Sequence, residues 1–370
     1  MQSKSSQHRV IRLLCLLAAF TLFAALVAAC GGGSSSESTG SSETSAETTE
    51  SEGEGGGGGE VSGKKIGYLD VAAAAPIEIR FQNAFKAAAE KLNWTVQLQD
   101  GAGEQEKTLT GARTLINSGV DAIVTSSVPA EWLQPVAAEA EAKEIPMINL
   151  ITKASPGVFQ GQVLEAQQAA SEKMAEKVKE ELPNGGEVAL FVEEEILALV
   201  ERAEILEEQF EGTNIKVVAN INVPIAENPK VQKATVDTLS ANPNLDAIIA
   251  TSDIQTPEVL AGLRTAGNKK VKLFGYYADS ANVKTMETNP EQFVAVVDSN
   301  IAEVSWIAAG ELASFFTGGK ITEIQEPEYT PVIVGPEDIT PGMLNEEGPV
   351  PFEEIGAPFY EEWKELYGIE

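Results

Sequence analysis

Histidine and cysteine are almost absent from this chain of 370 residues. The one histidine is His8 and the two cysteines are Cys15 and Cys30, so residues 31–370 contain neither residue type. This absence excludes Ser/His/Asp triads, Cys/His pairs, histidine-ligated zinc and disulfide bonds from that part of the chain. Carboxylates, lysines and tyrosines remain for catalysis, and hard oxygen ligands remain for a metal. We therefore expect neither a cofactor nor a metal site.

The N-terminal segment has the composition of a secretory signal peptide. Lys4, Arg9 and Arg12 give it a basic start, residues 13–27 are almost wholly apolar, and small residues precede Cys30. The apolar run is shorter than the ~20 residues that a membrane-spanning helix needs. Its closing Leu-Val-Ala-Ala-Cys resembles a bacterial lipobox, in which the cysteine thiol accepts a diacylglyceryl group and becomes the first residue of the mature chain. The alternative is an ordinary secretory signal in which the cysteine occurs by chance.

Lipidation at Cys30 would hold the protein at the extracytoplasmic face of the cell membrane. Each buried CH₂ group contributes ~0.8 kcal/mol to membrane binding, and stable anchoring needs at least two acyl chains. Residues 31–60 contain only Gly, Ser, Glu, Thr and one Ala, so they bury too little apolar surface to offset the entropy of ordering them. We predict a lipoprotein signal peptide at 1–29. At 30–60 we predict the lipidated cysteine and a disordered tether that reaches about 30 Å.

The chain is strongly acidic, with a formal net charge of −30, and loss of the three basic residues of the leader would bring it to about −33. Such a charge repels nucleic acid and anionic lipid headgroups, so we expect neither as a partner of the charged surface. The simplest interpretation is a solvated acidic surface, to which we assign the glutamates of 193–195 and 207–208. Roughly 310 residues follow the tether, enough for two domains with cores of their own.

From Lys65 the chain alternates between short apolar runs and amphipathic helices. After a first strand at 66–69, apolar residues recur at intervals of three and four, as on one face of a helix. Strands separated by such helices imply right-handed crossovers and a parallel sheet that is covered on both faces. Further strands are predicted at 96–98, 122–124, 145–148, 187–192, 215–221, 245–250, 271–275, 293–297 and 332–334.

The alternation begins a second time after a helix that ends at Pro183–Gly186. Residues 115–124 are similar to residues 239–249, because in each a helix ends in a turn and Asp-Ala-Ile then enters a strand. We therefore predict two tandem α/β lobes. A helix is also predicted at 301–317, and the aromatic residues of the C-terminal tail have helical spacing, which predicts a helix that docks on a lobe.

In this order and spacing, six stretches of the chain resemble the type I, or ribose/galactose-type, periplasmic binding proteins, the solute receptors of ATP-driven importers. The stretches are Lys65–Tyr68 to Pro76, the helix 85–92, and residues 119–124, 145–148, 242–248 and 273–275. The resemblance implies two Rossmann-like parallel-sheet lobes, joined by three hinge strands, that close over a ligand. The implied crossings lie near 160–166, 299–301 and 328–332. The lobes would comprise residues 61–162 plus 300–330 and residues 163–299 plus 331–345, with a tail at 346–370.

Ligands of open α/β sheets bind beyond the carboxyl ends of the strands. The candidate loops are therefore 70–80, 125–132, 149–153, 193–204, 222–227, 251–256, 276–280 and 298–300. The candidate ligand-binding residues within them are Glu78, Trp132, Thr152, Arg202, Ser252, Asp253, Tyr277 and Asn300.

Several of these candidates also have an ordinary structural interpretation. Trp132 fits core packing, and Glu78 fits an exposed first-turn carboxylate favoured by the helix dipole. Arg202 fits the surface equally well, and Asp253 fits a cap of the next helix. Compared with sugar-binding members of the family, several positions around the expected cleft are apolar here. A larger, less polar or cationic ligand is therefore as compatible with the sequence as a pentose or hexose.

The sequence favours a receptor over an enzyme. We expect a monomeric lipoprotein that captures a small solute by hinge closure and delivers it to an ABC transporter permease, contacting the membrane through the lipid on Cys30. One alternative is a ligand-sensing receptor for a membrane kinase or chemoreceptor. A second is a carboxylate-based hydrolase such as a glycosidase. A transcriptional regulator of the same fold is excluded by the secretion signal and by the lack of a helix-turn-helix segment.

Overall fold

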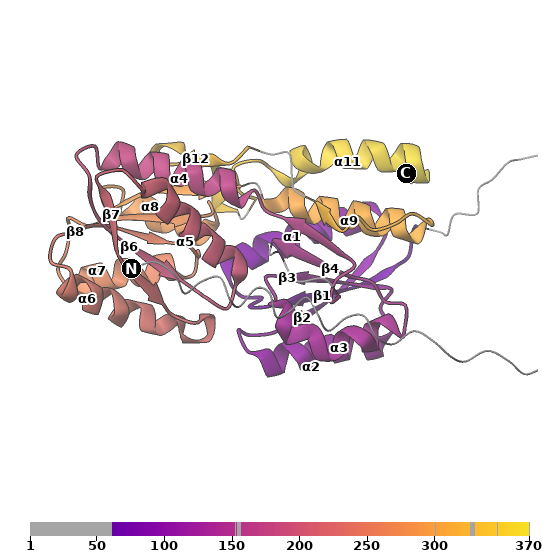
Figure 1. Ribbon diagram of the computed structural model, residues 1–370. Coiled ribbons are helices and arrows are strands. Elements are labelled where there is room, and N and C mark those ends of the chain that lie inside the picture. The colour runs from indigo at the N-terminus through magenta and orange to yellow at the C-terminus, as the bar shows by residue number, and fades with distance from the viewer. Residues whose placement is uncertain are drawn as a thin grey trace, which may run out of the picture. The chain divides into compact units, whose positions relative to one another are not determined.

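The computed structural model describes residues 61–151, 153, 157–299, 301–325, 330–345 and 347–369. Within these residues the chain forms two six-stranded sheets with helices around them (Figure 1). The predicted leader and tether, the lipidation site Cys30 and the candidate ligand contacts Thr152 and Asn300 lie outside the described residues.

The first sheet has the strand order β11-β5-β4-β3-β1-β2, and all its strands run parallel. Its strands are β1 (Lys65–Asp70), β2 (Thr95–Asp100), β3 (Ala122–Ser126), β4 (Met147–Ile151), β5 (Gly161–Leu164) and β11 (Ile324–Gln325). The helices between them are α1 (Pro76–Lys91), α2 (Gln105–Ser118) and α3 (Ala130–Glu141). The apolar periodicity predicted the first four strands and the three helices. It did not predict β5 and β11, which have only four and two residues.

The second sheet has the order β12-β10-β9-β8-β6-β7 and is parallel except for the antiparallel edge strand β12. Its strands are β6 (Gly186–Val192), β7 (Ile215–Asn222), β8 (Leu245–Ala250), β9 (Lys272–Tyr276), β10 (Phe293–Asp298) and β12 (Val332–Val334). Its helices are α4 (Gln167–Glu181), α5 (Leu197–Phe210), α6 (Val231–Ala241), α7 (Gln255–Thr265) and α8 (Ser280–Thr288), with a 3₁₀ turn η1 (Ile225–Lys230) before α6. These strands confirm the second run of predicted strands within one or two residues.

Alternate residues of the central strands face opposite sides of each sheet, as the two-residue period of a strand requires. In β1, Leu69 packs into a core with α2 and α3, whereas Tyr68 packs toward α1 and α9 (Ile301–Phe316). In β6, Phe191 packs with α7 and α8, whereas Leu190 packs with α4 and α5. Both sheets are thus buried on both faces, which is why their strands read as continuous apolar runs.

Both sheets share one strand order, β2-β1-β3-β4-β5 in the first lobe and β7-β6-β8-β9-β10 in the second. In the first sheet, β2 lies on one side of β1 and β3 lies on the other, so the order in which strands are added reverses between β1 and β3. The same reversal occurs in the second sheet between β6 and β8, because β7 and β8 flank β6. At such a reversal the loops after the two strands leave on opposite faces of the sheet, and a crevice opens between them. Each lobe therefore has one such point, at the carboxyl ends of β1 and β3 or of β6 and β8.

The chain passes between the lobes where the family resemblance places its three hinges: between β5 and α4, between β10 and α9, and between β11 and β12. It passes a fourth time, which the sequence did not predict. After a short turn η2 (Pro336–Asp338), helix α10 (Pro341–Leu344) packs on α8, and α11 (Phe352–Tyr367) then packs on α9 and α1. Figure 1 shows α11 running alongside α9. Buried Trp363 stacks on Trp306 with ring centroids 5.6 Å apart, which confirms the predicted docking of the tail.

No helix in the described part of the chain has both the length and the apolar character needed to cross a membrane.

Candidate ligand-binding site

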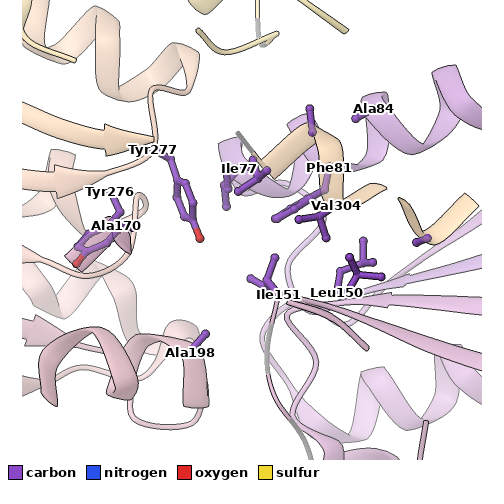
Figure 2. Packing of buried hydrophobic residues seen from close by; sticks show 14 of the residues in the cluster. Ile77, Phe81, Ala84, Leu150, Ile151, Ala170, Ala198, Tyr276, Tyr277 and Val304 are labelled. Carbon is purple, nitrogen blue, oxygen red and sulfur yellow. The ribbon is translucent and has the colours of Figure 1, made fainter. Parts of the chain in front are cut away.

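A cavity of about 30 Å³ lies between the strand-end loops of the two lobes. Figure 2 shows Ile77 and Ile151 of the first lobe on one side and Tyr277 of the second lobe on the other. All of its lining residues fall within the loops predicted from the strand ends. They are Val71, Ala72, Ala75, Ile77, Glu78, Ser127 and Ile151 from the first lobe, and Glu193, Ile196, Leu199, Ile225, Ser252, Asp253, Ile254 and Tyr277 from the second.

Glu78 enters the cavity from the first turn of α1. Pro76 occupies the first helical position, where its fixed φ suits a helix start and its missing N–H has no helical partner to lose. The carboxyl group is 2 % exposed and accepts hydrogen bonds from the Ser126 hydroxyl, at 2.5 Å, and from the Ser127 hydroxyl. Burial raises its pKa from 4.5 to about 7, although the two serine hydroxyls oppose the rise. The sequence favoured an exposed carboxylate here, and that interpretation was wrong because the second lobe covers the helix start.

Asp253 joins the two lobes at the cavity. Its Oδ2 accepts a hydrogen bond of 3.1 Å from the backbone N–H of Ile77, which belongs to the other lobe. The first N–H groups of a helix lack partners within the helix, and α1 has no side-chain cap of its own, so Asp253 satisfies one of them. The predicted cap of α7 is not made, because the side chain is used on α1 instead. Burial raises the pKa of Asp253 to about 6, opposed by backbone N–H groups such as that of Ile77.

Glu193 is a cavity residue that sequence reasoning missed. It directly follows β6, is 1 % exposed, and its Oε1 has no hydrogen-bond partner. Burial raises its pKa well above the ordinary value, and the charges of Asp253 and Glu195 add to this. Its assignment to a solvated acidic surface was wrong, since the first residue beyond β6 stands at the reversal point of the second lobe. That position in the strand order was the signal that could have identified it.

Arg202 does not line the cavity but holds one of its walls. Its guanidinium group is fully buried and forms an ion pair of 2.7 Å with Glu165, which lies at the hinge between β5 and α4. It also donates to the Tyr277 hydroxyl and lies 4.7 Å from the centroid of that ring. The remaining donors go to Gln167 Oε1 and Thr251 O, and a second ring, that of Tyr276, lies 4.3 Å away. Arg202 is therefore neither a surface residue nor a direct cavity contact, and it positions Tyr277.

Three non-glycine residues of the cavity wall have left-handed backbone conformations. The φ angles are 56° for Ser127, 63° for Ile151 and 70° for Tyr277. Such conformations cost free energy, most of all for a β-branched residue such as Ile151, and they concentrate at ligand-binding positions. Ile151 ends β4 and Tyr277 follows β9, which are equivalent strands in the two sheet orders. The two lobes thus direct equivalent strained residues into the cavity.

The other described candidates divide between the cavity and the core. Ser252 lines the cavity, and its hydroxyl opposes the rise in the pKa of Glu193. Trp132 does not line it, and packs half-buried against the core that α2 and α3 form with the first sheet. In the part of the chain that the structure describes, no group of acidic, histidine or cysteine side chains is arranged to hold a metal ion. The site thus offers carboxyl and hydroxyl groups in an otherwise aliphatic enclosure, which suits binding through ligand hydrogen-bond donors.

Comparison with known proteins agrees with this architecture. Residues 71–320, more than half of the chain, match the model of a periplasmic binding protein domain. The galactofuranose-binding protein YtfQ of Escherichia coli K12 is 32% identical over an alignment of 103 residues, and the match covers 24% of this chain and 32% of that protein.

Solved structures share the fold at low sequence identity. An ABC transporter solute-binding protein from Mycobacterium smegmatis with bound glycerol superposes with a TM-score of 0.67 at 21% identity, covering 75% of this chain and 95% of that one. A Caulobacter myo-inositol-binding protein gives 0.65 at 18% identity, covering 76% and 95%. The two-lobed α/β fold is therefore that of the type I periplasmic binding proteins, and on the match of residues 71–320 the chain belongs to the periplasmic binding protein family.

Proposed function

We propose that this protein is the solute receptor of an ABC importer and captures a sugar or a related small molecule between its lobes. The observation that carries the proposal is the cavity between the two reversal points, lined by polar groups from both lobes. The names of the relatives support the ligand class, since they are described as binding galactofuranose and myo-inositol.

Capture requires the lobes to move. A cavity of about 30 Å³ holds one or two water molecules, whereas small-molecule sites typically measure ~300–1,000 Å³. A sugar-sized ligand therefore enters with the lobes further apart, and the hinges bend as they close. The bond between Asp253 and the Ile77 N–H forms only when the lobes meet. A ligand that bonds to both lobes shifts the equilibrium toward an arrangement closed around the ligand, by its differential affinity for that arrangement.

We assign ligand contact to Glu78, Glu193, Ser252, Asp253 and Tyr277, with Arg202 as the residue that positions Tyr277. Thr152 and Asn300 stay candidates by their place in the sequence. Trp132 is not included, because it packs away from the cavity.

We further propose that the protein is a monomeric lipoprotein, anchored through Cys30 at the extracytoplasmic face of the membrane. The tether at 30–60 would carry lobes with the boundaries predicted above. Cys30→Ser tests this proposal, because the lipid-free chain should leave the membrane fraction and lose incorporation of a labelled fatty acid. A variant that stays membrane-bound and labelled would contradict the anchor.

Thermal unfolding of residues 61–370 against sugars, polyols, nucleosides, amines and aromatic acids tests the receptor function. A ligand that binds only the folded state adds ~2.7 kcal/mol at a hundredfold excess over its Kd. We expect one chemical class to raise the midpoint, and Asp253→Asn to lose the effect while the exposed control Glu90→Gln keeps it. A ligand recovered in altered form would indicate a hydrolase, and no response to any class would contradict the proposal.

A further inference from the structure

Hydrogen-bond acceptors outnumber donors among the side chains that line the cavity. The polar lining residues in the described part of the chain are Glu78, Glu193, Asp253, Ser127, Ser252 and Tyr277, which include neither an amide nor a basic side chain. The two arginines buried nearby are already paired. Arg80 bonds Asp298 at 2.5 and 3.1 Å, and Arg202 bonds Glu165 at 2.7 Å. The cavity therefore presents three carboxyl groups to its contents without a cation beside them in its described wall.

Two of the three hydroxyl groups in the described wall already have acceptors. Ser127 donates to Glu78, and Tyr277 donates to Glu165 at 2.7 Å. The Ser252 hydroxyl opposes the rise in the pKa of Glu193. Glu193 Oε1 remains without any partner although the side chain is 1 % exposed. An unpaired buried acceptor costs free energy, so a ligand that brings a donor to this atom gains affinity.

A ligand group that only donates hydrogen bonds differs from a sugar hydroxyl, which both donates and accepts. A sugar hydroxyl that donates to a carboxylate also carries lone pairs, and these need donors that the side chains here do not supply. An ammonium group carries three donors and no acceptor, and its bonds to carboxylates are charge-assisted. The remaining wall is aliphatic, with Ile77, Ile151 and Leu199 among its members, and suits the carbon skeleton of the ligand.

We infer that the ligand carries a protonated amine, which Glu193 receives together with Glu78 and Asp253. This inference rests on the proposed receptor function and narrows its ligand class to cationic solutes such as an amino sugar. An anionic sugar is disfavoured by the same three acidic groups, because its negative charge would oppose their ionisation in a buried site.

The electrostatics of the cavity agree with this assignment. Burial raises the pKa of Glu78 to about 7, that of Asp253 to about 6 and that of Glu193 well above its ordinary value. The charged and titratable groups that face these three are Tyr68 and Asp70 on β1, Glu195 after β6, Arg202 on α5 and Asp279 before α8. A bound cation favours the ionised carboxylates, so it releases protons, and its affinity rises as the pH rises through about 6 to 7.

Calorimetric titration of the full chain in detergent tests the inference with matched ligands. The set is glucosamine, N-acetylglucosamine, glucose and glucuronate, the galactose counterparts of the first three, and putrescine as an aliphatic amine. We expect an amine to bind at least about tenfold tighter than its acetylated and hydroxyl counterparts, and to release protons when two buffers of different ionisation enthalpy are compared. Tighter binding of amino sugars than of putrescine identifies the ligand as a carbohydrate amine. Tighter binding of putrescine identifies it as a polyamine.

Variants separate recognition from folding. Glu193→Gln is expected to lower the preference for the amine over its acetylated counterpart at least about tenfold, while the matched neighbour Glu194→Gln retains it. Thermal unfolding of both variants verifies that they fold. If a neutral sugar binds as tightly as its amine, or if Glu193→Gln leaves the preference unchanged, the inference is overturned and the receptor function stands. If no ligand binds, both are overturned.

Discussion

Glu78 makes the ligand-free protein less stable at high pH than a chain with a neutral side chain at that position. Its pKa is raised from 4.5 to about 7 by burial. Between pH 4.5 and about pH 7, the Glu78 carboxyl binds more protons in the folded state than in the unfolded state, so the free energy of unfolding falls as the pH rises. At about 1.4 kcal/mol for each pH unit, the loss amounts to about 3 kcal/mol and is complete once the pH exceeds about 7.

Glu78→Gln removes this penalty while keeping the shape of the side chain. One serine hydroxyl still donates to the amide oxygen, and the other accepts from the amide NH₂. We expect the variant to match the parent protein near pH 4.5, and to be more stable by about 3 kcal/mol near pH 8. Urea unfolding of both proteins from pH 4.5 to 8.5 measures the difference. Glu90→Gln, which replaces an exposed glutamate of the same helix, is the control and should follow the parent profile. Parallel profiles for Glu78→Gln and the parent protein would refute the burial argument.

Three further predictions concern packing and ion pairing in the described part of the chain. Trp363→Ala should lower the free energy of unfolding by about 3–5 kcal/mol, measured by thermal or urea unfolding, whereas Leu366→Ala, at a residue 61 % exposed, should cost far less. Arg202→Met should lower the free energy of unfolding by about 3–5 kcal/mol in urea unfolding, because it leaves Glu165 buried without its cation. Adding Glu165→Met should recover part of that loss. Additive losses in the double variant would contradict a coupled pair. Gly348→Ala should lower the free energy of unfolding by at least about 1 kcal/mol, since φ is +80° and a Cβ would collide with the guanidinium group of Arg80. Unchanged urea unfolding of this variant would contradict the contact.

The location of the site follows from local patterns in the sequence. Apolar runs such as 122–124 and 245–250 mark buried strands, and the helices between them force the strands to run parallel. Parallel strands end on one edge, so the loops after them are the predicted place of a ligand. Of the described candidates chosen on that basis, Glu78, Ser252, Asp253 and Tyr277 line the cavity, whereas Trp132 and Arg202 do not. The sequence by itself thus determined the architecture and the set of loops that builds the site.

The chemical state of the site was decided by the tertiary structure alone. Glu78 and Glu193 have the sequence context of solvated carboxylates, and they are buried because the opposite lobe covers them. The contacts that set their surroundings join residues far apart in the chain, 176 positions for Asp253 and Ile77 and 112 for Tyr277 and Glu165. No local period encodes such pairs, because a strand or helix pattern reports which face of an element is apolar and not which element will cover it. The grouping of the three carboxyl groups, the absence of a basic side chain from the described cavity lining and the fourth passage of the chain between the lobes therefore emerge only when the two lobes are placed together.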